Sequence, residues 1–429
     1  MSIAGKRVLI LGGVVSNLIL VQTAKDMGLY VIVTDNSPEP GPAKKIAHET
    51  ADVSTTDIDG LVQLCKERNV DAIFTGASEF NIRNCIRVCE KNGMRFYTDM
   101  KTWDNCANKA TFKGFCRKYG IDTPEVFDIS EDSTDEEIAK LPYPVIVKPV
   151  DSSSSNGITV CYEPAQIREA CRFARSMSGT ERIIVEKFIE NNRLLTSFSY
   201  LAKDGKIKCV FSCDDYQITQ SPSPFHHINA APSKHLDYYM ENVHEKAVKM
   251  FTEMGIRNGS FFVQTLPYEG KIYFMEMGYR IGGSGTMGKI IYPAMGFSAT
   301  ECLFNYIMGG DICSDEFLDN ADPQHMKCEG GAFVIVPTIG TIGKYEGLEE
   351  ASKIPGVVYV LKNYQEGDTI PKRAEGTLGQ YALNFVVLAD SMEQYLQIAE
   401  QVQNTVKILD TEGNLMSTMP IDFDRLRNK

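Results

Sequence analysis

The sequence contains no long apolar run and no surplus of basic residues. No stretch approaches the roughly 18 consecutive apolar residues that a membrane-spanning helix needs, so we expect no membrane partner. Lys and Arg number 44 against 56 Asp and Glu, which gives a formal net charge of −12 at pH 7 over 429 residues. A surface this acidic repels phosphate backbones, so we expect no nucleic-acid partner either.

The sequence also lacks the cysteine spacing of a zinc site. Its 12 cysteines form no CxxC pair. Cys85 and Cys89, and likewise Cys209 and Cys213, are four residues apart without Cys or His partners at zinc-site spacing. No secretory signal is recognisable before the first strand-like segment, so we expect reduced cysteines and a cytoplasmic protein. With 43% hydrophobic residues, the composition predicts a globular chain of two to four domains.

Residues 7–100 alternate strand and helix patterns, which predicts a parallel, doubly wound sheet. The first strand covers residues 8–11, and a helix over residues 16–27 stops at Gly28. Asp35 follows the second strand, where an NAD-binding protein places a ribose-binding acid. The turn after the first strand reads GGVVSN rather than GxGxxG, so a Rossmann-like domain with another task is the preferred interpretation.

Residues 143–157 combine an apolar strand, a lysine and a loop of small hydroxyl residues. Lys148 lies on a strand that is otherwise apolar, where its charge is costly unless it meets an anion. The serine loop that follows ends in Gly157, and such a loop can offer backbone N–H groups and hydroxyls to phosphates. The segment is not a Walker loop, because GxxxxGK is absent. The alternative is an edge-strand lysine followed by a linker.

Residues 183–189 place an apolar strand before Glu186 and Lys187, and then Phe188 and Ile189. This order suits a hinge whose backbone reads an adenine edge while apolar side chains hold its faces. Taken alone the segment is a weak signal, because many strands end in this way.

Residues 258–280 predict a hairpin that turns near Gly270. If its loop spans residues 269–271, Gln264 lies opposite Glu276, and both point to one face beside Phe262 and Phe274. Mg²⁺ binds to few protein oxygens when phosphate and water supply the rest. Arg280 follows and can hold a carboxylate or a developing phosphate bidentately.

In this order the three segments resemble the ATP-grasp superfamily. The resemblance is to the branch that contains biotin carboxylase, the carbamoyl-phosphate synthase large chain, the phosphoribosylglycinamide and phosphoribosylaminoimidazole enzymes, and the L-amino acid ligases. It spans the chain from Val8 to about Ile408 and implies an α/β and α+β fold. The implied domains are a Rossmann-like pre-ATP-grasp domain (1–105), an ATP-grasp core (106–310) with a lid (about 120–190) and a catalytic subdomain (about 191–310), and a small antiparallel α+β C-terminal domain (311–429).

The resemblance also implies cofactors and roles. ATP and Mg²⁺ (or Mn²⁺) would be the cofactors, Gln264 and Glu276 would bind the metal, and Arg280 and Lys148 would be catalytic. The serine loop would cover the phosphates, and the hinge would contact adenine. The implied nucleotide-binding set is Lys109, Lys148, Ser152, Ser153, Ser154, Ser155, Gly157, Glu186, Lys187, Phe188, Ile189 and Phe274.

Three positions depart from the family pattern. Many relatives carry glutamate at the position of Gln264. The family's Glu-x-Asn-x-Arg reads Glu276-Met-Gly278-Tyr-Arg280 here, which removes an expected metal ligand. Leu194 stands near the place of an expected ribose-binding acid. These changes leave open whether one or two magnesium ions bind.

The acceptor end of the site has two open interpretations. His226 and His227 lie where relatives place substrate-facing residues, and a histidine there can bind substrate or move a proton. Alternatively, residues 221–232 are a proline-rich surface turn. The small residues 282–288 indicate a small substrate. The implied substrate set is His226, His227, Arg280, Gly282 and Gly283.

The leading hypothesis is an ATP- and Mg²⁺-dependent ligase that joins a small carboxylate, such as an amino acid, to an amine through an acyl phosphate. The first alternative is a purine-precursor or carbamoyl-phosphate-type ATP-grasp enzyme. The second is a non-catalytic nucleotide-binding protein, prompted by the changed positions and opposed by the retained Lys109, Lys148, Glu276 and Arg280. The resemblance implies a homodimer.

Overall fold

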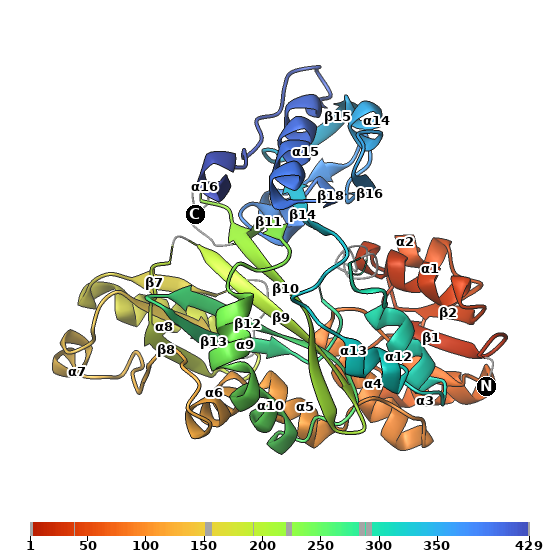
Figure 1. Cartoon of the computed structure of the whole chain (residues 1–429), viewed down its shortest axis with the longest axis horizontal. Helices are drawn as coiled ribbons and strands as arrows, with labels where there is room; N and C mark the ends of the chain where they lie inside the picture. Colours follow the sequence, from red (N-terminus) through yellow and green to blue (C-terminus); the bar gives the residue numbers. More distant parts are fainter. Residues whose placement is uncertain are drawn as a thin grey trace.

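The computed structural model describes residues 3–37, 39–150, 157–191, 193–219, 225–282, 288 and 294–427. Of the sequence-predicted site residues, Ser152, Ser153, Ser154, Ser155 and Gly283 lie outside this set. Figure 1 shows a Rossmann-like lobe at one end, a small lid sheet at the other, and a large sheet between them that continues into the C-terminal region. Among the described residues no helix is both long and apolar enough to cross a membrane.

The N-terminal lobe is a parallel sheet with helices on both faces. Its strand order is β3-β2-β1-β4, and every printed pairing is parallel. Strands β1, β2 and β4 are almost wholly apolar and buried, as expected when both faces are covered, whereas the edge strand β3 is not. The elements are β1 (Arg7–Leu11), η1 (Val15–Asn17), α1 (Leu18–Asp26), β2 (Tyr30–Thr34), α2 (Pro42–Lys45), β3 (Glu49–Ala51), α3 (Ile58–Glu67), β4 (Ala72–Phe74) and α4 (Glu79–Asn92).

The lid is an antiparallel sheet of order β5-β8-β6-β7 with α8 on one face. The apolar side chains of β6 alternate, so Val145 and Val147 pack under α8 while Lys148 points to the opposite face. The elements leading into and forming the lid are α5 (Met100–Ala107), α6 (Lys109–Lys118), β5 (Val126–Phe127), α7 (Asp135–Ala139), β6 (Val145–Pro149), β7 (Thr159–Cys161), η2 (Pro164–Gln166), α8 (Ile167–Ser176) and β8 (Ile183–Lys187).

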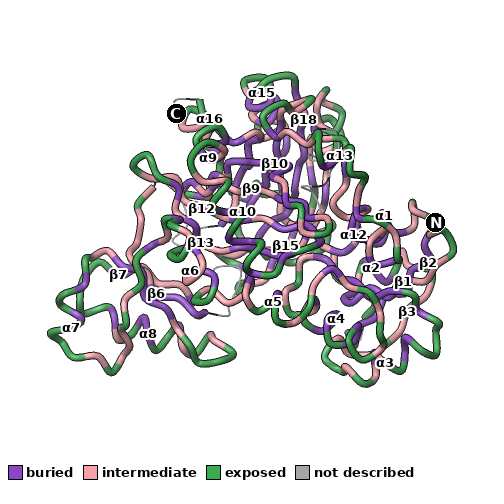
Figure 2. The backbone as a smooth tube through the Cα atoms, turned by 60° about the horizontal axis from the view of Figure 1, so that its bottom comes forward, coloured by how far each residue is buried: buried purple, intermediate pink, exposed green. Residues whose placement is uncertain are grey.

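The large sheet has the order β13-β12-β9-β10-β11-β14-β18-β16 and crosses the expected boundary at residue 310. Its buried residues concentrate along the central strands (Figure 2). The elements are β9 (Leu194–Lys203), β10 (Lys206–Gln217), β11 (His226–Ala230), α9 (Leu236–Asn242), α10 (His244–Glu253), β12 (Gly259–Tyr268), β13 (Lys271–Gly278), α12 (Ala299–Ile307), α13 (Asp315–Asn320), β14 (Glu329–Ile335), β16 (Val357–Lys362) and β18 (Leu383–Ala389).

A smaller sheet of order β17-β15-β19 completes the C-terminal region. The amphipathic helix α15 packs Tyr395 and Leu396 into a core shared with β14 and β18. The elements are β15 (Gly340–Glu346), α14 (Leu348–Ser352), β17 (Thr369–Ile370), η3 (Lys372–Ala374), η4 (Leu378–Gln380), α15 (Met392–Thr405), β19 (Lys407–Asp410) and α16 (Phe423–Arg427).

Two consecutive helices, α5 and α6, lead from the N-terminal lobe to the lid. Asn108 separates them: its side-chain oxygen accepts hydrogen bonds from the N–H groups of Ala110 and Thr111. Asparagine at an N-cap satisfies donors that a helix would otherwise leave open. The cap makes Lys109 the first residue of α6 and places its side chain at the edge of the cleft below the lid.

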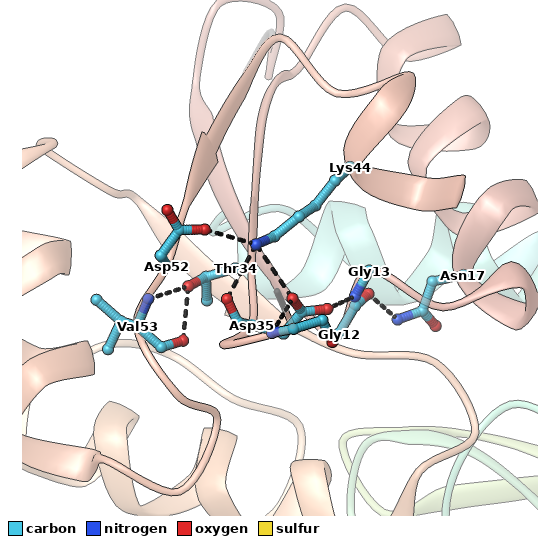
Figure 3. A network of polar contacts seen from close by, with 9 residues as sticks. Gly12, Gly13, Asn17, Thr34, Asp35, Lys44, Asp52 and Val53 are labelled. Carbon is cyan, nitrogen blue, oxygen red and sulfur yellow. Dashed lines mark hydrogen bonds and ion pairs between the residues drawn. The ribbon is translucent and has the colours of Figure 1, made fainter. Parts of the chain in front are cut away.

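The turn after β1 is held by an ion-pair network around the buried Lys44 (Figure 3). The Gly13 N–H donates to Asp35 at 2.5 Å, and the Lys44 Nζ lies 3.1 Å from Asp35 and 2.9 Å from Asp52. Burial alone would raise the pKa of Asp35, but the Gly13 N–H and the Lys44 ammonium outweigh it and lower the pKa. The Asp35 carboxylate therefore stabilises the turn and does not hold a ribose as it would in a dinucleotide site. This agrees with the incomplete glycine pattern of the turn.

We expect Lys44→Met to lower the free energy of unfolding by about 3 kcal/mol, because it leaves the buried Asp35 carboxylate without its cation. The folded state favours the ionised form of Asp35, so this contribution is present above about pH 4 and is lost as the pH falls through the lower folded pKa. Urea unfolding at pH 7 and at pH 3.5 measures both effects.

The matched control is Lys91→Met, because the Lys91–Asp59 pair is exposed on both sides. That variant should stay within about 0.5 kcal/mol of the parent chain. A loss for Lys44→Met no larger than that of the control would refute the structural role of the pair.

Candidate active site

A chain of three buried charges connects α6 to the lid. Lys113, one turn beyond Lys109 on α6, forms an ion pair with Glu186 on β8, and neither side chain has any exposed surface. The other Glu186 oxygen lies 2.6 Å from the Nζ of Lys148 on β6. Residues Ile146 and Glu186 pair across β6 and β8, which puts Lys148 and Glu186 on the same, cleft-facing side of the lid sheet.

Lys113 and Lys148 share the single carboxylate of Glu186. The group of three side chains therefore carries a surplus positive charge. Burial and the nearby Lys148 charge lower the pKa of Lys113 to about 8. Burial works against ionisation of Glu186, but Lys148 and Lys113 outweigh it and lower the pKa of its carboxyl. Lys148 is the member with some exposure, 8% of its side chain. The surplus charge therefore faces the cleft, where an anion would neutralise it.

The hairpin brings the two expected metal ligands together. Gln264 on β12 pairs with Glu276 on β13, as predicted. The hairpin reaches this pairing in a different way from the prediction. Its loop is Glu269–Gly270 rather than residues 269–271, and a β-bulge at Gln264/Thr265 shifts the strand register by one residue. The Glu276 carboxylate lies 3.4 Å from the Lys109 Nζ.

The charge of Glu276 suits a cation. Burial would raise the pKa of its carboxyl, but Lys109, Lys148 and Arg280 together lower it. One carboxylate and one amide oxygen fit Mg²⁺ when phosphate and water complete its coordination. Among the described residues, no group of three His, Cys, Asp or Glu side chains could hold a metal without such help.

Gly278 is a steric requirement of its partner strand. A Cβ at this position would lie 2.5 Å from the Cζ of Phe262, with which Gly278 is paired. The Phe262 ring therefore fills the space of the asparagine expected from the family pattern. The Arg280 guanidinium lies over the same ring, 5.1 Å from its centroid, and its Nε and Nη2 donate to Glu79 at 3.2 and 3.1 Å.

The hinge departs from the expectation at Glu186 and Phe274. The Glu186 side chain is turned inward to the two lysines, so it is not available to adenine. Phe274 is fully buried and stacks with Phe112 in the core, because the bulge pairs it with Thr265 on the face away from the cleft. Leu266 and Tyr273 take the cleft face instead.

The other hinge residues do line a hollow. Lys187, Phe188 and Ile189 border a pocket of about 390 Å³ together with Tyr268 and Tyr273. Its lining of apolar, aromatic and charged side chains can hold a flat heterocycle. A second hollow of about 640 Å³ lies on the other side of the segment 123–125, next to β5 and Arg182. Only the first of these two hollows contains the hinge residues 187–189.

Two of the predicted glycines are described. Gly157 has a φ of +76°, and a Cβ there would lie 2.8 Å from Met177 and Pro149, so only glycine fits at the end of the serine loop. Gly282 has no atom within 4 Å of an added Cβ.

The two predicted histidines separate. The His227 side chain is buried, its Nε2 lies 3.1 Å from the Met419 carbonyl oxygen, and burial lowers its pKa to about 4. It is a neutral packing residue, and its predicted contact with substrate is wrong. His226 is partly exposed and its Nδ1 lies 2.6 Å from Asp215.

Sequence reasoning missed three residues of this region: Lys113, Glu79 and Asp215. The four-residue spacing of Lys109 and Lys113 on one helix was a usable signal, because such residues share a face. Glu79 and Asp215 come from segments remote from Arg280 and His226 in sequence, so only the folded arrangement reveals them.

Residues 108–291 match the family model described as "Carbamoyl-phosphate synthase L chain, ATP binding domain". A curated protein of Sulfurisphaera tokodaii named formate-dependent phosphoribosylglycinamide formyltransferase is 25% identical over 383 residues, which is 87% of this chain and 91% of that protein. A protein of the same name from Syntrophotalea carbinolica is 22% identical over 90% of this chain and 92% of its own length.

Solved structures with the same fold cover almost the whole chain. An L-amino acid ligase from Bacillus licheniformis has a TM-score of 0.77 at 20% identity, covering 95% of this chain and 99% of its own. A phosphoribosylglycinamide synthetase from Anaerococcus prevotii has a TM-score of 0.74 at 19% identity, covering 95% and 100%. The biotin carboxylase domain of Hydrogenobacter thermophilus 2-oxoglutarate carboxylase, solved with MgADP and bicarbonate, has a TM-score of 0.76 at 20% identity, covering 96% and 91%.

We expect Lys148→Met to abolish ADP formation without unfolding the protein, because Lys113 still neutralises Glu186. In the double variant Lys113→Met/Lys148→Met the buried Glu186 carboxylate has neither cation, so the free energy of unfolding should instead fall by about 3 kcal/mol. Steady-state ADP release and thermal unfolding of both variants test this division. Normal turnover in Lys148→Met would overturn the phosphate assignment.

We expect Gly278→Asn to destabilise the protein by about 1–3 kcal/mol, because the new side chain overlaps the Phe262 ring. The double variant Phe262→Ala/Gly278→Asn removes the overlap and should recover most of that loss. The Mg²⁺ dependence of ADP release by the double variant then reports whether the restored asparagine adds metal affinity. Equal stability of the single variant and the parent chain would contradict the steric argument.

Proposed function

Because the chain is an ATP-grasp enzyme, we propose that it uses ATP to activate a small carboxylate as an acyl phosphate and transfers the acyl group to an amine. The observation that carries the proposal is the surplus positive charge at Lys148, set beside the ionised Glu276 and its partner Lys109. A cation pair and a carboxylate around one cleft suit a polyphosphate with its metal ion.

Each side chain has a task in this reaction. Lys148 and Lys109 bind the phosphate oxygens that become more negative as the γ-phosphoryl group moves. Gln264 and Glu276 would hold Mg²⁺, which neutralises phosphate charge when it is bound. Arg280 leaves Glu79 to hold the incoming carboxylate, whose oxygen attacks phosphorus. The phosphate then serves as the leaving group that the carboxylate alone lacks.

We place a purine-precursor substrate ahead of an amino acid pair, which reverses the order derived from the sequence. Support comes from the curated relatives, whose name specifies formate and phosphoribosylglycinamide and which match this chain over most of their length. Formate is the smallest carboxylate, in keeping with the small residues after Arg280. The acceptor would then be the amine of a glycinamide.

Amino acid ligation remains a second candidate on the evidence of one contact. Glu79 and Arg280 present opposite charges about 3 Å apart at the cleft. A zwitterion could replace this contact with two, placing its ammonium on Glu79 and its carboxylate on Arg280. The retained lysines and Glu276 weigh against the third reading, a nucleotide-binding protein without chemistry.

The test is ADP release with Mg²⁺-ATP in the presence of formate and phosphoribosylglycinamide, and in parallel with pairs of amino acids. Hydroxylamine added with the carboxylate alone traps an acyl phosphate as a hydroxamate. We expect carboxylate-dependent hydroxamate and acceptor-dependent ADP release, both absent in Lys148→Met. ATP hydrolysis that no carboxylate stimulates, or none at all, would refute the proposal.

A further inference from the structure

A row of polar side chains continues across the large sheet from the metal ligands. Gln264 pairs with Ser197 of β9, and Leu195, two residues along the same strand, pairs with Asp215 of β10. Asp215 in turn pairs with Asn229 of β11. Paired residues and residues two apart on a strand share a face. Asp215 and Asn229 therefore lie on the same face as Gln264.

His226 joins this row because β11 is irregular. The register shifts at Tyr216/Gln217, which sets His226 opposite Gln217 and beside Asp215 rather than on the other face. The His226 Nδ1 lies 2.6 Å from Asp215 Oδ1, and the Asn229 Nδ2 lies 3.3 Å from the same nitrogen. The His226 side chain is 22% exposed and the Asp215 side chain is 13% exposed.

The contact with Asp215 selects the tautomer of the neutral His226 imidazole. A carboxylate accepts the Nδ1–H, which leaves Nε2 with a lone pair in the neutral ring. Among the described residues no hydrogen bond occupies Nε2. The Tyr381 hydroxyl donates to the His226 backbone carbonyl at 2.8 Å and fixes the start of the strand. His226 is thus oriented as a proton acceptor with its open nitrogen towards the cleft side of the sheet.

The spacing from the metal ligands fits an acceptor site. β12 and β11 are separated laterally by three strand intervals, about 14 Å at about 4.8 Å each. The pairings also move four residues along the strands between Gln264 and His226, about 13 Å at about 3.3 Å each, so the two backbones lie about 20 Å apart. The phosphoryl group, the acyl carbon and the attacking amine must fit between Gln264 and His226. These three groups and the reach of the two side chains fill a span of this order.

We infer that Asp215 and His226 form the acceptor-amine site, an inference that rests on the proposed function. An amine arrives largely protonated at neutral pH and cannot attack in that state. His226 Nε2 takes one proton from the ammonium, and the freed nitrogen lone pair forms the C–N bond to the acyl carbon. The C–O bond to phosphate breaks with its electron pair, and the second amine proton leaves with the phosphate. His226 is the catalytic base, and Asp215 is a positioning residue.

Two nucleophiles separate this role from the rest of the reaction. Hydroxylamine is largely unprotonated at neutral pH and needs no base, whereas the amine of phosphoribosylglycinamide does. With formate and Mg²⁺-ATP, His226→Gln should form hydroxamate within twofold of the parent chain. Its kcat for phosphoribosylglycinamide-dependent ADP release should fall about 100-fold or more, the range of a lost general base. Asp215→Asn should lower the same kcat about tenfold with little change in KM.

The matched control is His325→Gln. His325 also lies 2.7 Å from an aspartate, Asp322, but on the exposed surface away from the row. It should alter neither nucleophile's rate. Equal losses with both nucleophiles in His226→Gln, or no loss with the amine, would overturn the assignment. Absence of hydroxamate in the parent chain with any carboxylate would instead refute the proposed function, and the acceptor site with it.

Discussion

The buried Glu186 carboxylate is the interaction on which the site depends. A charge with no exposed surface is tolerated only when it is paired, and Glu186 has two partners that come from different parts of the chain. Lys113 belongs to α6, below the lid, and Lys148 to the lid sheet itself. The carboxylate therefore attaches the lid to the helix that carries Lys109. Because two lysines share this one carboxylate, one positive charge is not neutralised, and that charge can attract an anion to the cleft.

Much of the architecture could be read from the sequence because it follows from apolar periodicity. The parallel N-terminal sheet, the strand that carries Lys148 and the hairpin with Gln264 opposite Glu276 all follow patterns of alternating or continuous apolar residues. The structural details that the sequence did not reveal depend on single local features, a helix cap and a β-bulge. Asn108 caps α6 and separates it from α5, and one bulge moves Phe274 to the core while preserving the pairing of Gln264 with Glu276.

The partners of charged side chains could not be predicted in the same way. The order of residues 183–189 indicates a hinge, but nothing in it says that Glu186 turns inward, because its partners lie on α6 and β6. His226 and His227 are adjacent and identical in type, yet the irregular start of β11 gives one a carboxylate and buries the other. One departure from the family pattern also has a local cause: the ring of Phe262 occupies the place above Gly278 and supports Arg280.

The continuous hydrogen-bonding of the large sheet has a mechanical consequence. Gln264, Glu276 and His226 sit on strands of one sheet, with β11 three intervals away from β12. That separation does not depend on the position of the lid, because the lid sheet shares no strand with the large sheet. The sheet therefore fixes the distance between these side chains. Phosphate and amine meet at one acyl carbon, so this carbon must lie between β12 and β11, at a place that closure of the lid does not alter.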